Sequence, residues 1–254
     1  MRAVAADGHL SGVALASGLL LTAWLVAGQP LVGAWSHERF RRALGTDPRA
    51  RLDRYRRTAL IEWAAVTASL ALVAYAPGLD LGDVGVRWPR LSDSGAPYTV
   101  VGGLGLVLSV LLLRGLRRRV DRGADLRAPR EVAALLPRTA AERRGFAAVA
   151  VTAGVCEETL YRGVLLGLAA TLLPDLSPAR LAVVSALAFG LAHTYQGAAG
   201  MLTTTVLGGC LAVLYLGSGS LLLPVLYHVL VDLRVLVLLV RQRGPGRHAA
   251  PRTG

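Results

Sequence analysis

The sequence contains no lysine, few charged residues of any kind and only two cysteines. Charged residues make up 17% of the 254 residues and apolar residues 54%, whereas soluble domains carry about a quarter charged residues. A soluble core of this size has no use for so much apolar surface, so the composition favours one membrane-embedded domain. Cys156 and Cys210 both lie in apolar stretches, and two such residues do not form a disulfide scaffold.

The net charge of +12 comes from arginine alone. A nucleic-acid partner would explain such a balance, but the arginines cluster beside apolar segments and lack interleaved aromatic residues. The positive-inside rule, by which cytoplasmic loops of membrane proteins collect basic residues, accounts for this pattern. We therefore expect a lipid bilayer and no nucleic acid as the surroundings of this chain.

Seven apolar segments are long enough to be considered as membrane-spanning helices. They are residues 10–35, 58–76, 98–113, 146–173, 179–195, 201–216 and 221–240. A cleaved signal peptide is the competing interpretation of the first segment, but its apolar core is too long and its basic cluster follows it. The sequence therefore predicts an all-α fold, a polytopic bundle of about seven transmembrane helices.

Three arginine-rich regions predict the orientation of the bundle. Residues 36–57 contain eight arginines, residues 114–144 form a second basic region, and the tail after Arg241 is the third. If all three are cytoplasmic, an odd number of crossings places the amino terminus outside and the carboxyl terminus inside, most simply in the plasma membrane. Residues 130–144 mix apolar and charged side chains, which predicts an amphipathic helix on the membrane surface.

The chain divides into three parts. Residues 1–130 hold the first transmembrane helices and the basic loops, residues 131–240 hold a helical core with polar residues, and residues 241–254 form a basic tail that we expect to be disordered. Ionisable side chains inside a membrane are costly, about 2.5–3.5 kcal/mol on insertion scales, and usually functional. Those in the core are therefore the candidate site.

The first cluster is V-C-E-E-T-L-Y-R, which contains Glu157, Glu158 and Arg162. Residues four apart share a helical face, so Glu158 is expected to pair with Arg162. Glu157 is rotated by about 100° and is left free to face the interior of the bundle. A structural ion pair explains one acid and one arginine, but the second acid needs another partner.

Two further apolar segments supply that partner. F-G-L-A-H places Phe189 and His193 on one face, and H-V-L-V-D does the same for His228 and Asp232. Asp232, one turn from His228, is in the right place to fix the tautomer of the imidazole. Each pair alone is explained as a buried hydrogen-bonding pair, whereas together they offer the residue types that activate water.

The ordered set resembles the CPBP family (CAAX protease and bacteriocin-processing, also Abi-like) of intramembrane endopeptidases. The family pattern E-E-x-x-x-R falls on Glu157, Glu158 and Arg162, and F-x-x-x-H falls on Phe189 and His193. The third motif falls on His228 and residue 232. The ionisable residues of the three motifs are the candidate catalytic set: Glu157, Glu158, Arg162, His193, His228 and Asp232.

The resemblance implies a peptidase that cuts a membrane-associated peptide or protein, with prenylated CAAX proteins as substrates of the eukaryotic members. By analogy Glu157 and His193 would activate water, His228 and residue 232 would assist at the carbonyl, and Glu158 and Arg162 would support them. The resemblance also allows a divalent metal such as Zn, whose ligands would be Glu157, His193, His228 and Asp232. A metal-free glutamate mechanism is equally compatible with the sequence.

Asp232 stands where CAAX proteases usually have Asn. An ionised Asp cannot donate a hydrogen bond, so residue 232 must be protonated, orient His228 or help to bind a cation. Two other functions remain open from the residues alone: a non-catalytic membrane scaffold or bacteriocin self-immunity protein, and a small proton-coupled transporter. The oligomeric state is left open.

Overall fold

A computed structural model describes residues 12–75, 80–90, 96–122 and 130–242. Within these ranges every regular element is a helix, so the predicted all-α fold is confirmed. In chain order the elements are α1 (Gly12–Ala23), the π-helix η1 (Trp24–Gly28), α2 (Gln29–Ala43), α3 (Ala50–Tyr75), α4 (Ala96–Asp121), α5 (Arg130–Leu135), α6 (Ala140–Glu158), the π-helix η2 (Thr159–Leu165), α7 (Leu166–Leu172), α8 (Pro178–Ala192), the 3₁₀-helix η3 (Thr194–Gln196), α9 (Gly197–Ser218) and α10 (Leu222–Gln242).

Three stretches of helix in the described residues are long and apolar enough to cross a membrane. They are Ala14–Ala43, Ala50–Tyr75 and Thr194–Ser218, and α8 is a shorter apolar helix. Only 17% of the most apolar window of the first stretch is buried inside the protein, so most of its apolar side chains face outward, as lipid contact requires. A helical membrane bundle is therefore consistent with the structure, and the number of seven crossings stays a prediction.

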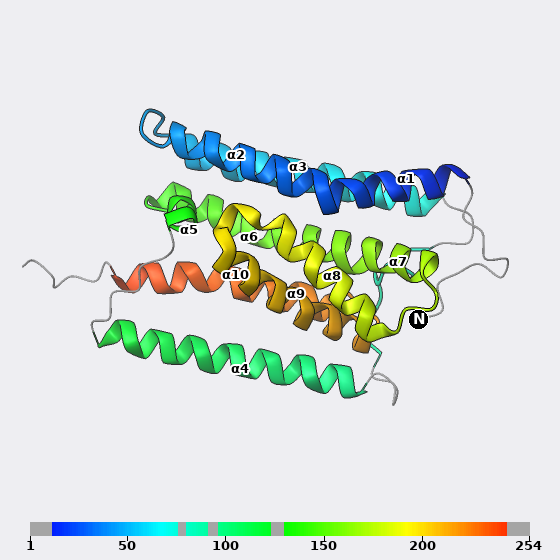
Figure 1. Cartoon of the computed structure of the whole chain (residues 1–254). Coiled ribbons are helices and arrows are strands. Elements are labelled where there is room, and N and C mark those ends of the chain that lie inside the picture. Colours follow the sequence, from blue (N-terminus) through cyan, green and yellow to red (C-terminus); the bar gives the residue numbers. More distant parts are fainter. Residues whose placement is uncertain (1–11, 76–79, 91–95, 123–129, 243–254) are drawn as a thin grey trace, which may run out of the picture.

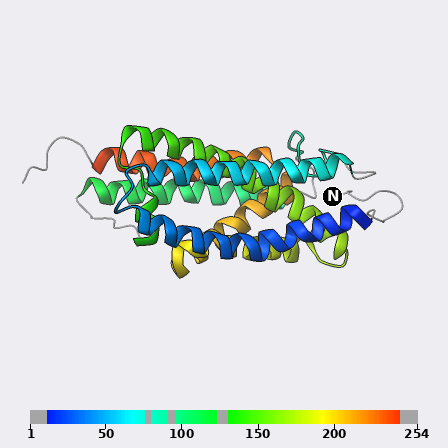
Figure 2. The ribbon, with the colours of Figure 1, turned by 90° about the horizontal axis from the view of Figure 1, so that it is seen from above.

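The long helices run back and forth along one axis (Figure 1). Helices α1 to α3 cover one side of the bundle, α4 covers the opposite side, and α6 to α10 lie between them (Figures 1 and 2). Helix α6 packs against α3 and α10, whereas α9 packs against α8 and α4. Helix α6 is therefore the central helix between the amino-terminal and carboxyl-terminal elements.

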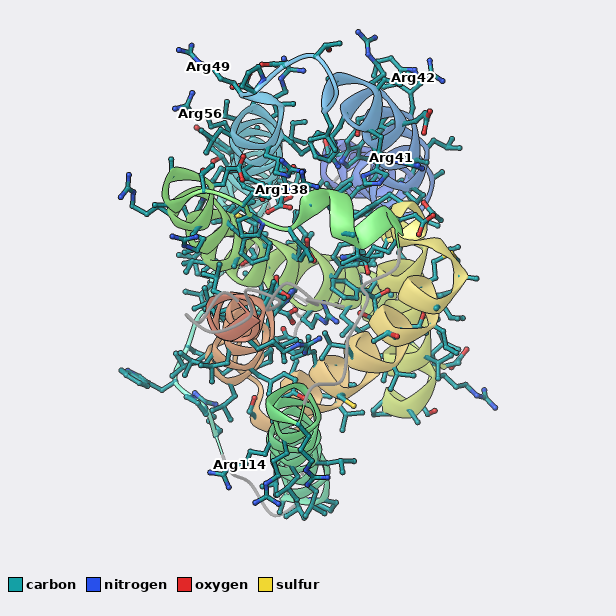
Figure 3. The ribbon with its side chains drawn as sticks, turned by 90° about the vertical axis from the view of Figure 1, so that its left-hand side faces the viewer. Arg41, Arg42, Arg49, Arg56, Arg114 and Arg138 are labelled. Carbon is teal, nitrogen blue, oxygen red and sulfur yellow. The ribbon has the colours of Figure 1, made fainter. Side chains whose placement is uncertain are left out.

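Arginines from distant parts of the sequence gather at one end of the bundle. Figure 3 looks onto that end and labels Arg41, Arg42, Arg49, Arg56, Arg114 and Arg138. The described chain enters α1 at the other end and leaves α10 at this one (Figure 1). This arrangement agrees with basic regions on one side of a membrane. The side and the membrane to which they belong stay predictions. Residues 243–254 of the predicted tail lie outside the described residues.

Several predicted boundaries were wrong because arginine is a good helix former. The basic stretch 36–57, expected to be a loop, is helical except for residues 44–49, and α4 continues to Asp121. His37 lies in this helical part of the basic stretch and is buried in α2, with its ring centroid 5.9 Å from that of Phe40 and 5.5 Å from that of Tyr195.

The predicted surface helix 130–144 is also shorter than expected. Helix α5 ends at Leu135, and the buried Pro137 separates it from α6. The next helix starts with a capping box, in which the Thr139 hydroxyl accepts from the Glu142 backbone N–H and the Glu142 carboxylate accepts from the Thr139 backbone N–H. This reciprocal pair satisfies two free backbone donors, so Arg143 and Arg144 belong to α6.

Candidate active site

Glu157 and Glu158 end α6, and Arg162 follows in the π-helix η2. Glu158 and Arg162 are fully buried, and Arg162 Nη1 donates to Glu158 Oε1 at 3.0 Å, as the spacing predicted. Single π-helical turns widen a helix locally and are frequent at functional sites. The widened turn carries the arginine that holds one of the two acids.

Arg162 connects three elements. Its Nη2 donates to the backbone oxygen of Gly208 in α9 at 3.0 Å, and its guanidinium carbon lies 4.3 Å from the ring centroid of Phe189 in α8. Gly208 leaves the space for this approach, since a Cβ there would lie 2.9 Å from Phe189 Cδ1. Arg162 therefore joins η2 to α8 and α9 through one buried cation.

His228 in α10 is held by the same carboxylate oxygen. Its Nδ1 lies 2.7 Å from Glu158 Oε1, and the residue is buried. The Asp232 carboxylate, which the sequence offered as the group that orients this imidazole, lies 3.8 Å away from Nε2 instead. Glu158 thus makes the orienting contact, because the crossing of α6 and α10 brings it closer than the residue one turn along.

His193 follows directly on the end of α8 and is fixed by its own helix. Its Nδ1 lies 2.8 Å from the backbone oxygen of Phe189. A carbonyl only accepts, so Nδ1 carries the proton, and in the neutral ring the lone pair is on Nε2. The Phe189 ring lies against this imidazole with centroids 4.7 Å apart and is 5.8 Å from that of His228.

The free edges of both imidazoles face Glu157. Its Oε2 lies 3.8 Å from His193 Nε2 and 3.9 Å from His228 Nε2. This oxygen is buried and has no hydrogen-bond partner among the described residues. The structure therefore brings Glu157, His193 and His228, from three separate helices, around one point.

These groups line a cavity of about 350 Å³. Its lining also includes Arg54 of α3 and the apolar side chains of Val132 and Leu135 in α5. Asp232 also lines it, with 36% of its side chain exposed. Phe189 and other apolar side chains form much of the remaining wall, so the polar groups of the site lie in mainly apolar surroundings.

One acid that lines the cavity was missed in the sequence. Glu62 in α3 is buried and lines the same cavity as Glu157. The signal was present, because Glu62 is an ionisable residue in the apolar segment 58–76, and such residues are functional candidates. It escaped notice because it has no partner at helical spacing.

The residues that would serve a metal are the right types but are not arranged as a ligand group. Imidazole nitrogens and carboxylates suit Zn²⁺, and donors at about 2.1 Å from a tetrahedral ion lie about 3.4 Å from one another. Here the closest nitrogen–oxygen pairs are 3.8–3.9 Å apart. Within the described ranges, no group of three or more His, Cys, Asp or Glu side chains is placed to hold a metal ion.

The described residues thus form a helical bundle with buried acids and imidazoles around a cavity. Residues 142–234 match the family model described as Rce1-like, type II CAAX prenyl endopeptidase Rce1-like. The resemblance to CAAX proteases is therefore confirmed over this segment, which is less than half of the chain. The comparisons with curated proteins and with solved structures gave no match.

Proposed function

We propose that this chain is an intramembrane endopeptidase that hydrolyses a peptide bond of a membrane-associated protein or peptide. The match of residues 142–234 to the CAAX-protease model supports the reaction class. The arrangement of Glu157, His193 and His228 supports the chemistry. The observation that carries the proposal is Glu157 Oε2, a buried oxygen without a partner that faces two imidazole nitrogens.

The spacing of these three atoms suits one bridging water. Glu157 Oε2 is 3.8 Å from His193 Nε2 and 3.9 Å from His228 Nε2, which is too long for direct hydrogen bonds. A water about 2.8 Å from Glu157 Oε2 and from an imidazole nitrogen would bridge the two side chains. His193 Nε2 offers a lone pair to such a water, since its Nδ1 donates to Phe189. Glu157 and His193 therefore hold and polarise the nucleophile.

Hydrolysis then proceeds by general base and general acid steps. The Glu157 carboxylate takes one proton from the water as its oxygen bonds to the carbonyl carbon of the substrate. The same proton passes to the amide nitrogen as the carbon–nitrogen bond breaks, which leaves a new carboxyl end on one product and a new amino end on the other. His228, in its doubly protonated form, donates from Nδ1 to Glu158 and from Nε2 to the developing oxyanion.

Glu158, Arg162 and Asp232 have supporting roles. Glu158 orients His228, and Arg162 holds Glu158. Asp232 faces the cavity near His228 Nε2 and contributes charge there, with no oxyanion contact in its ionised form. Zinc at Glu157, His193, His228 and Asp232 would activate water by a different route, but the described side chains form no ligand group, so no step is assigned to a metal.

The test is cleavage in liposomes by the purified protein. Membrane-anchored peptides with varied sequences near their carboxyl ends are incubated with the wild type, and the products are identified by mass spectrometry. Glu157→Gln should abolish cleavage, by about 10²–10⁴-fold or more for loss of a general base. Glu142→Gln is the matched control for neutralising a buried acid of the same helix, and Gln also completes a capping box. Since this variant also removes the ion pair of Glu142 with Arg51, at 3.8 Å, the rates are compared per folded protein, measured by circular dichroism.

Two results would overturn the proposal. One is the absence of cleavage by wild-type protein over the whole peptide set, which would favour the scaffold or immunity function. The other is cleavage by Glu157→Gln at the rate of the Glu142→Gln control.

A further inference from the structure

Glu62 is a buried acid of α3 that lies outside the segment matched by the family model. It is 7% exposed and lines the same cavity as Glu157 and the two histidines. Two contacts fix its position against α6. Trp63 Nε1 donates to Thr152 Oγ1 at 3.3 Å, and Val66, one turn further along α3, packs in the core cluster that contains Cys156.

Glu62 and Glu157 are two acids in the lining of one cavity. Oε2 of each acid is buried without a hydrogen-bond partner among the described residues. No Arg or His nitrogen in the described ranges forms an ion pair with Glu62 within 4.0 Å. Arg54, two helical turns earlier on α3, lines the same cavity and interacts electrostatically with Glu62, but its hydrogen bond goes to Ser36.

A purely structural role does not explain this placement. A buried carboxyl in a membrane helix is costly unless it is paired, and an apolar side chain would fill the same space without that cost. Breaks in the local rules of stability are expected at functional sites. The acid is therefore better explained by what it does to Glu157.

We infer that Glu62 is a positioning residue of the peptidase site, which orients the Glu157 carboxylate toward the two imidazoles through a hydrogen bond between the two side chains. This inference rests on the proposed function. It assigns the amino-terminal helices a part in the active site, since α3 supplies the residue. A side-chain amide donates the same hydrogen bond that a protonated carboxyl donates, so Gln should replace Glu62 and an apolar residue should not.

The experiment compares Glu62→Gln, Glu62→Leu and the control Ser69→Ala in the liposome cleavage assay. Ser69 is a buried residue of the same helix that does not line the cavity. The expected result is a kcat near that of the wild type for Glu62→Gln and Ser69→Ala. For Glu62→Leu, loss of a partner that orients a reacting group should lower kcat about 10–100-fold, with KM and the thermal unfolding midpoint in detergent unchanged.

Either of two results would overturn the inference: a wild-type kcat in Glu62→Leu, or a kcat in Glu62→Gln as low as in Glu62→Leu. The Gln variant decides by itself if Leu prevents folding, because the inference requires it to keep its kcat. Failure of the proposed function is distinguishable, since it appears as cleavage by Glu157→Gln or as no cleavage by the wild type. Loss of cleavage in Glu157→Gln together with full cleavage in Glu62→Leu refutes the role of Glu62 alone.

Discussion

Replacing Arg162 with Met tests whether burial makes the Arg162–Glu158 ion pair important for the stability of the fold. The Arg162 side chain is 0% exposed and donates to Glu158 Oε1 and to the Gly208 backbone oxygen, both at 3.0 Å. Met is similarly long and unbranched but has no donor. The variant therefore removes both hydrogen bonds while it keeps most of the packing against Phe189.

The expected loss of stability in Arg162→Met arises because the Glu158 carboxylate stays buried without its arginine partner. Removing one member of a buried ion pair costs about 3–5 kcal/mol, because the other charge remains buried. Glu158 would keep only His228, at 2.7 Å, and its Oε2 already lacks a partner. We expect Arg162→Met to lower the free energy of unfolding by about 3–5 kcal/mol, and added Glu158→Gln to restore part of it by removing the charge.

An exposed pair of the same spacing supplies the control. Arg42 Nε lies 3.1 Å from Glu38 Oε1, also four residues apart, but the two side chains are 77% and 50% exposed. Arg42→Met should therefore cost less than about 1 kcal/mol. Denaturant titration in mixed micelles, followed by circular dichroism, measures both losses; equal losses, or a double variant less stable than Arg162→Met, would refute the reasoning.

Three further predictions use the same assays. Asp232→Asn should keep cleavage, because His228 is held through its Nδ1; a loss beyond about 100-fold, the scale of a general acid or base, would show that the carboxylate itself takes part. Dialysis against a chelator should leave kcat unchanged. A fall in kcat that is reversed by added Zn²⁺ would contradict the glutamate mechanism. Gly208→Ala should lower stability by about 1–3 kcal/mol through overpacking against Phe189, 2.9 Å from the new Cβ, whereas Gly103→Ala, with nothing within 4 Å, should not.

The helical spacing rules predicted the local part of the site. Residues four apart share a face, so the pairing of Glu158 with Arg162 and the contact of Phe189 with His193 followed from the sequence and are present in the structure. The freedom of Glu157 to face inward followed from the same rule. The all-α fold followed from the long apolar segments and is confirmed.

The parts that depend on how helices cross were not predictable in this way. No spacing rule brings His228 to Glu158 instead of Asp232, because that contact is set by the packing of α10 on α6. Glu62 was missed for the same reason, since the other acids that line its cavity lie on other helices. The burial of His37 required knowing that α2 continues past the apolar segment.

The most direct test of the shared water is a double-mutant cycle on kcat with Glu157→Gln and His193→Gln. If both side chains act on one water molecule, their effects are not additive, and the double variant should cleave the membrane-anchored peptide no more slowly than the slower single variant. A kcat of the double variant reduced by the product of the two single losses would contradict the account, because it would show that the two residues act independently.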